Sequence, residues 1–124
     1  MEIPSEVLEV LENYESVVLN YKKLSPEMRD ELEGYYLMRD EALIRKENEG
    51  LVGVEANWTD EIKQWPEKYY VIGHDGCGNY YYLDKEDNTV GFYDHDEMSF
   101  ETEAENLQQY ANMISKFILE ESQS

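Results

Sequence analysis

The residues best suited to chemistry in this chain lie in one short turn, which contains His74, Asp75 and Cys77. A cysteine nucleophile needs a nearby base to generate the thiolate, and a further group to orient that base. Here the candidate nucleophile and base share one loop, and the sequence indicates no orienting group or oxyanion donor. A small residue that fits between two glycines explains Cys77 more simply, so we assign no catalytic residues. An enzyme would instead require a pocket with perturbed acids converging on His74 or His95.

Two segments carry metal-binding residue types, but neither has the spacing of a metal site. One contains His74 and Cys77, and the other is the run Asp94-His95-Asp96-Glu97. Structural zinc needs paired ligands, and calcium needs alternating oxygens with a glycine and a distal Glu. The glycine-rich run 73–78 leads into a tyrosine-rich strand rather than a helix, so a phosphate cradle is not expected either. We therefore predict no metal and no cofactor.

A three-stranded antiparallel meander is predicted around this turn, at about residues 69–94. The apolar and aromatic runs are Tyr69–Ile72, Tyr80–Leu83 and Val90–Tyr93, and short turn-forming segments separate them. Asp-Gly supplies the positive φ that tight hairpin turns require, and Tyr, Val, Ile and Phe suit a pleated surface. This stretch is therefore expected to form the centre of a sheet.

The second hairpin has an expected register, because a four-residue loop at 85–88 fixes which residues face each other. The expected pairs are Leu83 with Val90, Tyr81 with Phe92, and Tyr82 with Gly91. One face of the sheet is then evenly apolar and should meet a helix. The other carries Tyr80, Tyr82 and Tyr93, and we expect it to be half exposed or covered by the N-terminal helices.

Helices are expected before the meander. Pro4-Ser5 opens an amphipathic pattern that predicts a helix over 6–23, and Ser25-Pro26 marks the start of a second helix. We expect the second helix to break at Gly34. A helical or irregular piece over 41–48 should follow, with a stop at Gly50 and an edge strand at 51–54.

A C-terminal helix is the best-defined helical element. The run Thr102-Glu103-Ala104-Glu105 matches a capping box, and an apolar stripe follows at steps of three and four residues. The stripe consists of Leu107, Tyr110, Ala111, Ile114, Phe117 and Ile118. It should cover the sheet. In the connection 57–66, Trp58 and Trp65 are expected to have a structural role, with exposed interface anchors as the alternative.

The charge of the chain limits its possible partners. The sequence has 29 acidic and 10 basic residues, for a net charge of −19. Such a surface repels phosphate backbones and anionic lipid, so we expect neither nucleic-acid nor membrane binding. A basic protein is the natural complement, although an acidic balance can also serve solubility alone.

Length and composition fit one domain over residues 1–124 with an ordinary hydrophobic core, since 41% of the residues are apolar. The single cysteine excludes an intrachain disulfide, and the sequence shows no signal peptide or membrane span. A cytoplasmic location is the default expectation. We expect a monomer or a weak homodimer.

The run from Val71 to Asp84 resembles the central hairpin of the SMI1/KNR4 (SUKH) superfamily. It has an aliphatic pair, a glycine-rich turn with an acidic residue, a small polar residue, aromatics and a closing Leu-Asp. Trp65-Pro66 and the C-terminal amphipathic pattern are also similar. The Leu-Pro, Tyr-x-x-Phe and Asn-Gly-Gly progression of many members is not found near the N-terminus. The resemblance implies an α+β fold, with the antiparallel sheet packed against N-terminal helices and a C-terminal helix.

The resemblance also implies a binding function without catalysis. Bacterial members are implied to be immunity proteins that neutralise polymorphic toxins, many of them nucleases. We therefore expect an immunity protein that occludes a basic toxin cleft. The alternative is a regulatory or scaffold domain that binds an endogenous protein, as fungal relatives are implied to do. Partner contacts are expected at the hairpin ends and on the tyrosine-rich face. The predicted contact residues are Asp75, Asp84, Asp87, Asp94, Asp96, Glu97, Tyr80 and Tyr82.

Overall fold

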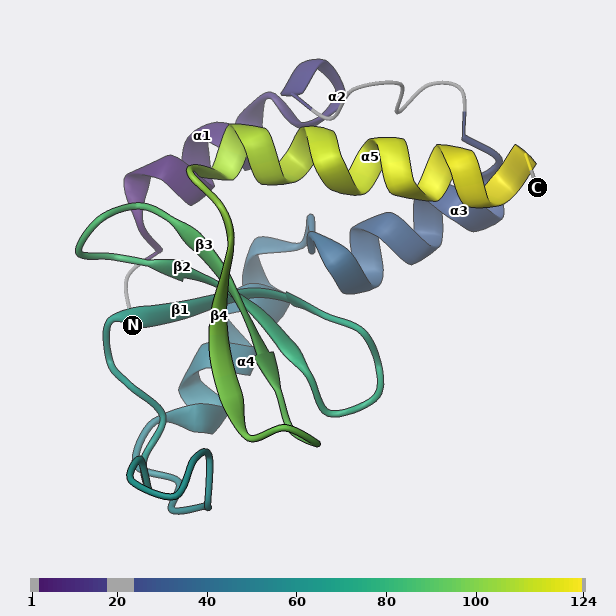
Figure 1. Ribbon diagram of the computed structural model, residues 1–124. Helices are drawn as coiled ribbons and strands as arrows, with labels where there is room; N and C mark the ends of the chain where they lie inside the picture. The colour runs from purple at the N-terminus through teal and green to yellow at the C-terminus, as the bar shows by residue number, and fades with distance from the viewer. Residues whose placement is uncertain (1–2, 18–23, 124) are drawn as a thin grey trace.

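The computed structural model describes residues 3–17 and 24–123, whose arrangement is shown in Figure 1. The first elements are α1 (Ser5–Glu12), α2 (Tyr14–Val17), α3 (Pro26–Glu31), the π-helical turn η2 (Leu32–Tyr36) and α4 (Glu41–Leu51). The later elements are β1 (Tyr69–His74), β2 (Tyr80–Asp84), β3 (Val90–Asp94), β4 (Ser99–Ala104) and α5 (Leu107–Gln123). The predicted α+β class, with an antiparallel sheet and helices before and after it, is confirmed.

The strands form one antiparallel sheet in the order β1-β2-β3-β4. The predicted meander is confirmed, and so is the register of its second hairpin. The pairs are Tyr80–Tyr93, Tyr81–Phe92, Tyr82–Gly91 and Leu83–Val90. The apolar face meets α5 as expected, since the ring centroids of Tyr81 and Tyr110 lie 5.4 Å apart.

The strand β4 was not predicted from the sequence, and the capping box expected at residues 102–105 is wrong. Residues 99–104 pair with β3, and α5 begins only at Leu107. Asn106 lies just before this helix, and its side-chain oxygen accepts a hydrogen bond from the Gln109 amide at 2.8 Å. Pairing with β3 gives the backbone of this segment regular partners, which outweighs a local preference for a helix start.

The helix α5 crosses over the sheet in Figure 1. Leu107, Tyr110, Ala111 and Ile114 are buried, as the apolar stripe predicts. Phe117 departs from the prediction, because its side chain is 48% exposed. The side chain of Ile118 lies outside the described part of the chain.

The first helix is shorter than predicted. α1 ends at Glu12, and a break at Asn13 separates it from α2. The side-chain amide of Asn13 donates to the Glu9 carbonyl at 3.0 Å, so a local hydrogen bond forms at this helix end. The predicted continuation over 18–23 lies outside the described residues. The start of α3 is confirmed, because the Ser25 hydroxyl caps it by accepting from the backbone at 3.3 Å.

The break expected at Gly34 is wrong, because α3 continues directly into η2. Two buried tyrosines satisfy carbonyls at the end of this turn. The Tyr14 hydroxyl donates to the Leu37 carbonyl at 2.5 Å, and the Tyr110 hydroxyl donates to the Tyr36 carbonyl at 2.6 Å. Helix-end carbonyls need such partners when they are buried. Residues distant in sequence therefore fix where this segment ends.

The helix α4 includes Gly50, so the predicted stop there is wrong, and the predicted edge strand at 51–54 is wrong as well. Instead, α4 covers the edge of β1. The Asn48 side-chain amide donates to the Val71 carbonyl at 2.9 Å, and its oxygen accepts from the Val71 amide at 2.7 Å. One side chain thereby replaces a neighbouring strand and closes the sheet edge at this point.

The connection between α4 and β1 covers the tyrosine-rich face of the sheet, which was expected to be half exposed or covered by the N-terminal helices. Trp58 and Trp65 meet edge to face with ring centroids 5.1 Å apart, and both pack against the core, as their predicted structural role requires. The Tyr93 hydroxyl donates to the Trp58 carbonyl at 2.7 Å. Tyr82 stacks on Tyr69 and is 4% exposed. This face is therefore closed by aromatic packing.

Candidate protein-binding surface

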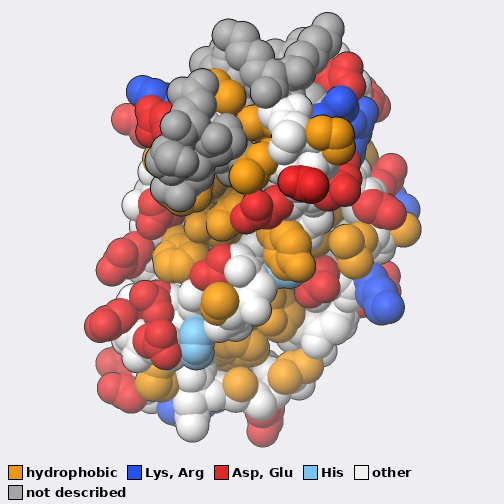
Figure 2. Space-filling model, turned by 90° about the vertical axis from the view of Figure 1, so that its right-hand side faces the viewer, with side chains coloured by type: hydrophobic (Ala, Val, Ile, Leu, Met, Phe, Trp, Pro, Cys, Tyr) orange, Lys and Arg blue, Asp and Glu red, His pale blue; other side chains and the backbone are white. Residues whose placement is uncertain are grey.

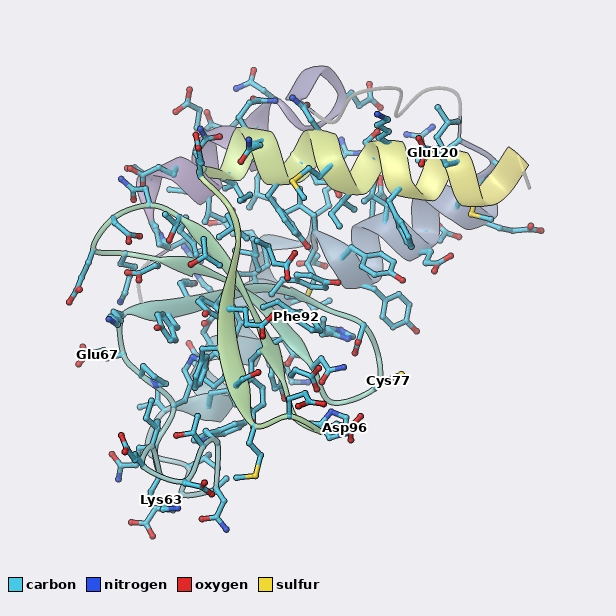
Figure 3. All side chains as sticks on the ribbon, viewed as in Figure 1. Lys63, Glu67, Cys77, Phe92, Asp96 and Glu120 are labelled. Carbon is cyan, nitrogen blue, oxygen red and sulfur yellow. The ribbon has the colours of Figure 1, made fainter. Side chains whose placement is uncertain are left out.

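The acidic residues predicted to contact a partner lie at two opposite ends of the sheet. The β1–β2 and β3–β4 loops share one end and the β2–β3 loop occupies the other, because consecutive strands run antiparallel. We call the first the acidic end, and it comprises Asp75, Asp94, Asp96 and Glu97. Figure 3 shows Cys77 and Asp96 on its two loops. Asp84 and Asp87 lie at the other end.

Four of the predicted aspartates stabilise the hairpin loops: Asp75 and Asp87 lie in them, and Asp84 and Asp94 directly precede them as the last residues of β2 and β3. Each accepts a hydrogen bond from the backbone amide two residues further on. The bonds are Cys77 to Asp75 at 2.8 Å, Glu86 to Asp84 at 2.9 Å, Thr89 to Asp87 at 3.0 Å and Asp96 to Asp94 at 2.9 Å. Such Asx turns satisfy the amides of a tight loop. Asp96 and Glu97 are the more exposed carboxylates of the acidic end.

The predicted tyrosines and Asp84 are less accessible than their positions in the sequence suggest. Tyr82 and Asp84 are buried, with 4% and 8% of their surface exposed. Tyr80 is half-buried, and its ring packs 5.5 Å from that of Trp65. Within the predicted set, the residues with exposed side chains are therefore Asp87, Asp96 and Glu97.

Asn79 joins the two loops of the acidic end. Its side-chain oxygen accepts from the His95 amide at 2.8 Å and lies 2.6 Å from Nδ1 of the same residue, while its Nδ2 donates to Asp75 at 2.7 Å. Burial alone would raise the pKa of Asp75, but hydrogen bonds from Asn79 and Cys77 outweigh burial and lower it. These bonds hold the Asp75 carboxylate in place and connect the β1–β2 loop to His95 of the β3–β4 loop.

The groups considered for nucleophilic chemistry are engaged in local contacts. Nδ1 of His74 accepts from the Gly76 amide at 3.2 Å, and the imidazole packs edge to face on Tyr35 with centroids 5.1 Å apart. Cys77 is exposed in the loop. This geometry does not couple the thiol to the imidazole in the way a thiolate nucleophile requires.

Asp94, His95 and Asp96 bring three possible metal-ligand atoms within 4.8 Å of one another. Asp94 accepts hydrogen bonds from the Asp96 and Glu97 amides, and the His95 ring faces Asn79. These contacts form the loop between β3 and β4. Loop structure is therefore a sufficient explanation for the cluster.

A second surface adjoins the acidic end. A cross-strand row runs through Gly73, Tyr81, Phe92 and Glu101, one residue from each strand. The half-buried rings of Tyr81 and Phe92 lie 4.9 Å apart, and Tyr36 lies 6.1 Å from Tyr81. We call this surface the aromatic–acidic face. It comprises Tyr35, Tyr36, Tyr81, Phe92, Phe117, Glu101 and Glu103.

Exposed rings lie at the border of this face. Tyr35 is 43% exposed, and Phe117, which packs 6.3 Å from Tyr36, is 48% exposed. A surface hollow lined by Tyr35, Tyr36 and Asp75 connects the face to the acidic end. Figure 2 shows the molecule from this side, where hydrophobic side chains gather along the middle and acidic side chains surround them. Large aromatic side chains next to polar groups are typical of protein-binding surfaces.

The carboxylates of the aromatic–acidic face lack basic partners among the described residues. Within residues 3–17 and 24–123, no lysine or arginine forms an ion pair with Glu101 or Glu103. Burial and then the Glu101 carboxylate raise the pKa of Glu103. Burial, with Tyr36, Asp75 and Glu103 as further causes, raises the pKa of Tyr81 to about 12. Negative charge is therefore held beside half-buried rings, where a cation would relieve the repulsion.

The sequence did not predict the aromatic–acidic face. Glu101 and Glu103 were missed because the residues that follow Glu101 resemble a helix start. The alternation of Phe100 and Thr102 with these two glutamates is a strand signal, and it would have placed both carboxylates on one side of β4. No local signal brings Tyr36 to Phe117, because these residues meet only through packing of η2 on α5.

Comparison with known proteins identifies one family. A family model described as SMI1 / KNR4 family (SUKH-1) matches residues 1–120. The match spans almost the whole chain and so extends far beyond the hairpin that carries the sequence resemblance. No curated protein and no solved structure matches the chain. No described helix has both the length and the apolar character that a bilayer span requires.

Proposed function

Because the chain belongs to the SMI1/KNR4 family (SUKH-1), we propose that it is a non-enzymatic protein-binding module that acts as an immunity protein. Its partner is a cognate bacterial polymorphic toxin with a basic surface, such as a nuclease. The family supports a binding role, and the charge of −19 supports a basic partner.

One structural observation supports a particular surface as the binding site for this partner. The aromatic–acidic face combines exposed rings, Tyr35 and Phe117, with the carboxylates of Glu101 and Glu103, and it adjoins the acidic end. Interfaces derive most of their affinity from a few buried aromatic anchors, whereas charges determine steering and specificity. This surface offers both kinds of group together.

The proposed mechanism is occlusion. The negative potential steers the chain onto the basic cleft with which the toxin would otherwise bind nucleic acid, which accelerates association. Aromatic rings then lose water against the toxin surface, which slows dissociation. The toxin is neutralised because its cleft is covered, so the mechanism requires no chemical step.

The experiment is a calorimetric titration of the purified toxin encoded beside this chain. The test variant is Asp96→Lys with Glu97→Lys at the acidic end. The control is Asp60→Lys with Glu61→Lys, which makes the same change in net charge at exposed residues of the α4–β1 connection, outside the acidic end. We expect the test variant to bind at least tenfold more weakly than the control. Equal affinities for both variants would move the interface away from the acidic end, and no binding by the unmodified chain would contradict the proposed function.

A further inference from the structure

We propose that the aromatic–acidic face receives an arginine side chain of the protein partner, with the guanidinium between Glu101 and Glu103 and its flat side against Tyr81 and Phe92. This inference rests on the proposed function, because it specifies the chemistry that the partner brings to this surface.

The sheet register brings the required groups together. Phe92 of β3 is paired with Tyr81 on one side and with Glu101 on the other, so a ring pair and a carboxylate are consecutive in one cross-strand row. Glu103 lies two residues along β4, close enough to Glu101 and Tyr81 for their charges to interact. A planar guanidinium can stack on a ring and donate to carboxylates at the same time.

Arginine suits this place better than lysine. The rings are half-buried, so a bound cation must lose part of its hydration, and a guanidinium is more weakly hydrated than an ammonium group. An ammonium group is also a compact point charge, so it does not present a flat surface to Tyr81 and Phe92.

The described arginines of the chain itself are engaged elsewhere. Arg29 pairs with Glu15 at 3.2 Å, Arg39 with Glu33 at 3.0 Å and Arg45 with Glu41 at 2.9 Å. A second copy of the chain is also a poor occupant, because two such faces would bring the carboxylates of both copies together. Like charges at an interface oppose association. Charge complementarity therefore favours a basic partner.

The test uses capped peptides of sequence Gly-Ser-X-Leu-Ser-Gly, in which X is arginine, lysine or citrulline. Citrulline has the shape of arginine without its charge. Binding is followed by NMR of the aromatic ring signals of the full chain. We expect the arginine peptide to shift the signals of Tyr81 and Phe92 while leaving Tyr93, on the opposite face of the sheet, unchanged. Affinity should fall at least fivefold with citrulline and less with lysine.

Glu101→Gln with Glu103→Gln should remove the shifts at Tyr81 and Phe92. The matched control is Glu47→Gln with Glu49→Gln on α4, which removes the same charge elsewhere and should retain these shifts. Shifts spread over the whole acidic surface, equal loss in both variants, or self-association through this face would overturn the inference. These results concern the arginine site alone, whereas failure of the toxin titration would contradict the proposed function itself.

Discussion

Gly73 of β1 lies directly beneath the backbone carbonyl of Tyr36. A Cβ atom built on Gly73 would overlap that carbonyl, and it would also meet the carbonyl of Tyr35. The π-helical turn can therefore rest on the sheet only where a strand residue has no side chain. This contact places the Tyr36 ring beside Tyr81, so the formation of the aromatic–acidic face depends on one glycine.

Gly73→Ala should destabilise the chain by about 3 kcal/mol, because backbone atoms rather than a flexible side chain must move to admit the methyl group. Gly50→Ala is the control. Gly50 lies inside α4 with open space around it, so alanine should stabilise the chain by about 0.5–1 kcal/mol through its higher helix propensity. Urea unfolding of both variants measures the difference, and similar effects in both would refute the close contact.

Asn48→Ala should lower the free energy of unfolding by about 2–4 kcal/mol, because it leaves both the amide and the carbonyl of Val71 without partners in a buried position. Hydrogen exchange of the Val71 amide provides a local measurement, and its protection should fall together with the free energy of unfolding. Asn57→Ala, in the exposed connection, should change stability by less than about 0.5 kcal/mol. If the Val71 amide stays protected from exchange in Asn48→Ala, another group must form its hydrogen bond, which would contradict this role of Asn48.

Asp75→Asn tests whether the hydrogen bonds from Asn79 and Cys77 to Asp75 stabilise the folded chain, and the readout is the free energy of unfolding as a function of pH. The pKa of Asp75 is lower in the folded chain than its ordinary value of about 3.9, because hydrogen bonds favour the charged form. Its stabilising contribution should be complete above that ordinary value and should disappear as pH falls through the lowered folded pKa. The free energy of unfolding of the unmodified chain should therefore exceed that of the variant by about 1 kcal/mol at pH 7 and by less at pH 2. The figure at pH 7 takes into account that the carboxylate is partly exposed to solvent. A difference that does not change with pH would contradict this role.

Glu103→Gln tests whether charge on the aromatic–acidic face is kept at the expense of stability. The folded pKa of Glu103 is raised, so its ionisation should destabilise the folded chain as pH rises through and above the ordinary value for Glu. The variant should be more stable than the unmodified chain at pH 7, by about 0.5 kcal/mol or less because this side chain is exposed. The same variant should bind the toxin more weakly. Lower stability together with unchanged binding would assign Glu103 a structural role alone.

Three strands of the sheet, β1 to β3, could be predicted from the sequence because the information that specifies them is local, whereas β4 was missed. Tight turns join the paired strands, and the alternation around Leu83 and Val90 permits one register that buries an apolar face. Helix ends could not be predicted as well, because partners distant in sequence decide them. Tyr110 supplies the hydrogen bond that completes η2, 74 residues away from the carbonyl that accepts it.

The acidic residues predicted as contacts lie at hairpin ends, and their role as contacts stays a prediction. Asp75, Asp84, Asp87 and Asp94 also form the turns, as their spacing from the following amides indicates. The aromatic–acidic face combines residues of η2, the sheet and α5. Such a surface forms only when the chain folds, so no motif in the sequence predicts it.

The association rate constant with the toxin, measured by stopped flow as sodium chloride rises from 20 to 500 mM, tests the central claim most directly. Screening shortens the range of the field from the chain, whose net charge is −19. We predict that the rate constant falls by a factor of about 10 or more, while the dissociation rate constant changes little. An association rate constant that does not depend on salt would contradict capture of a basic partner by the acidic surface.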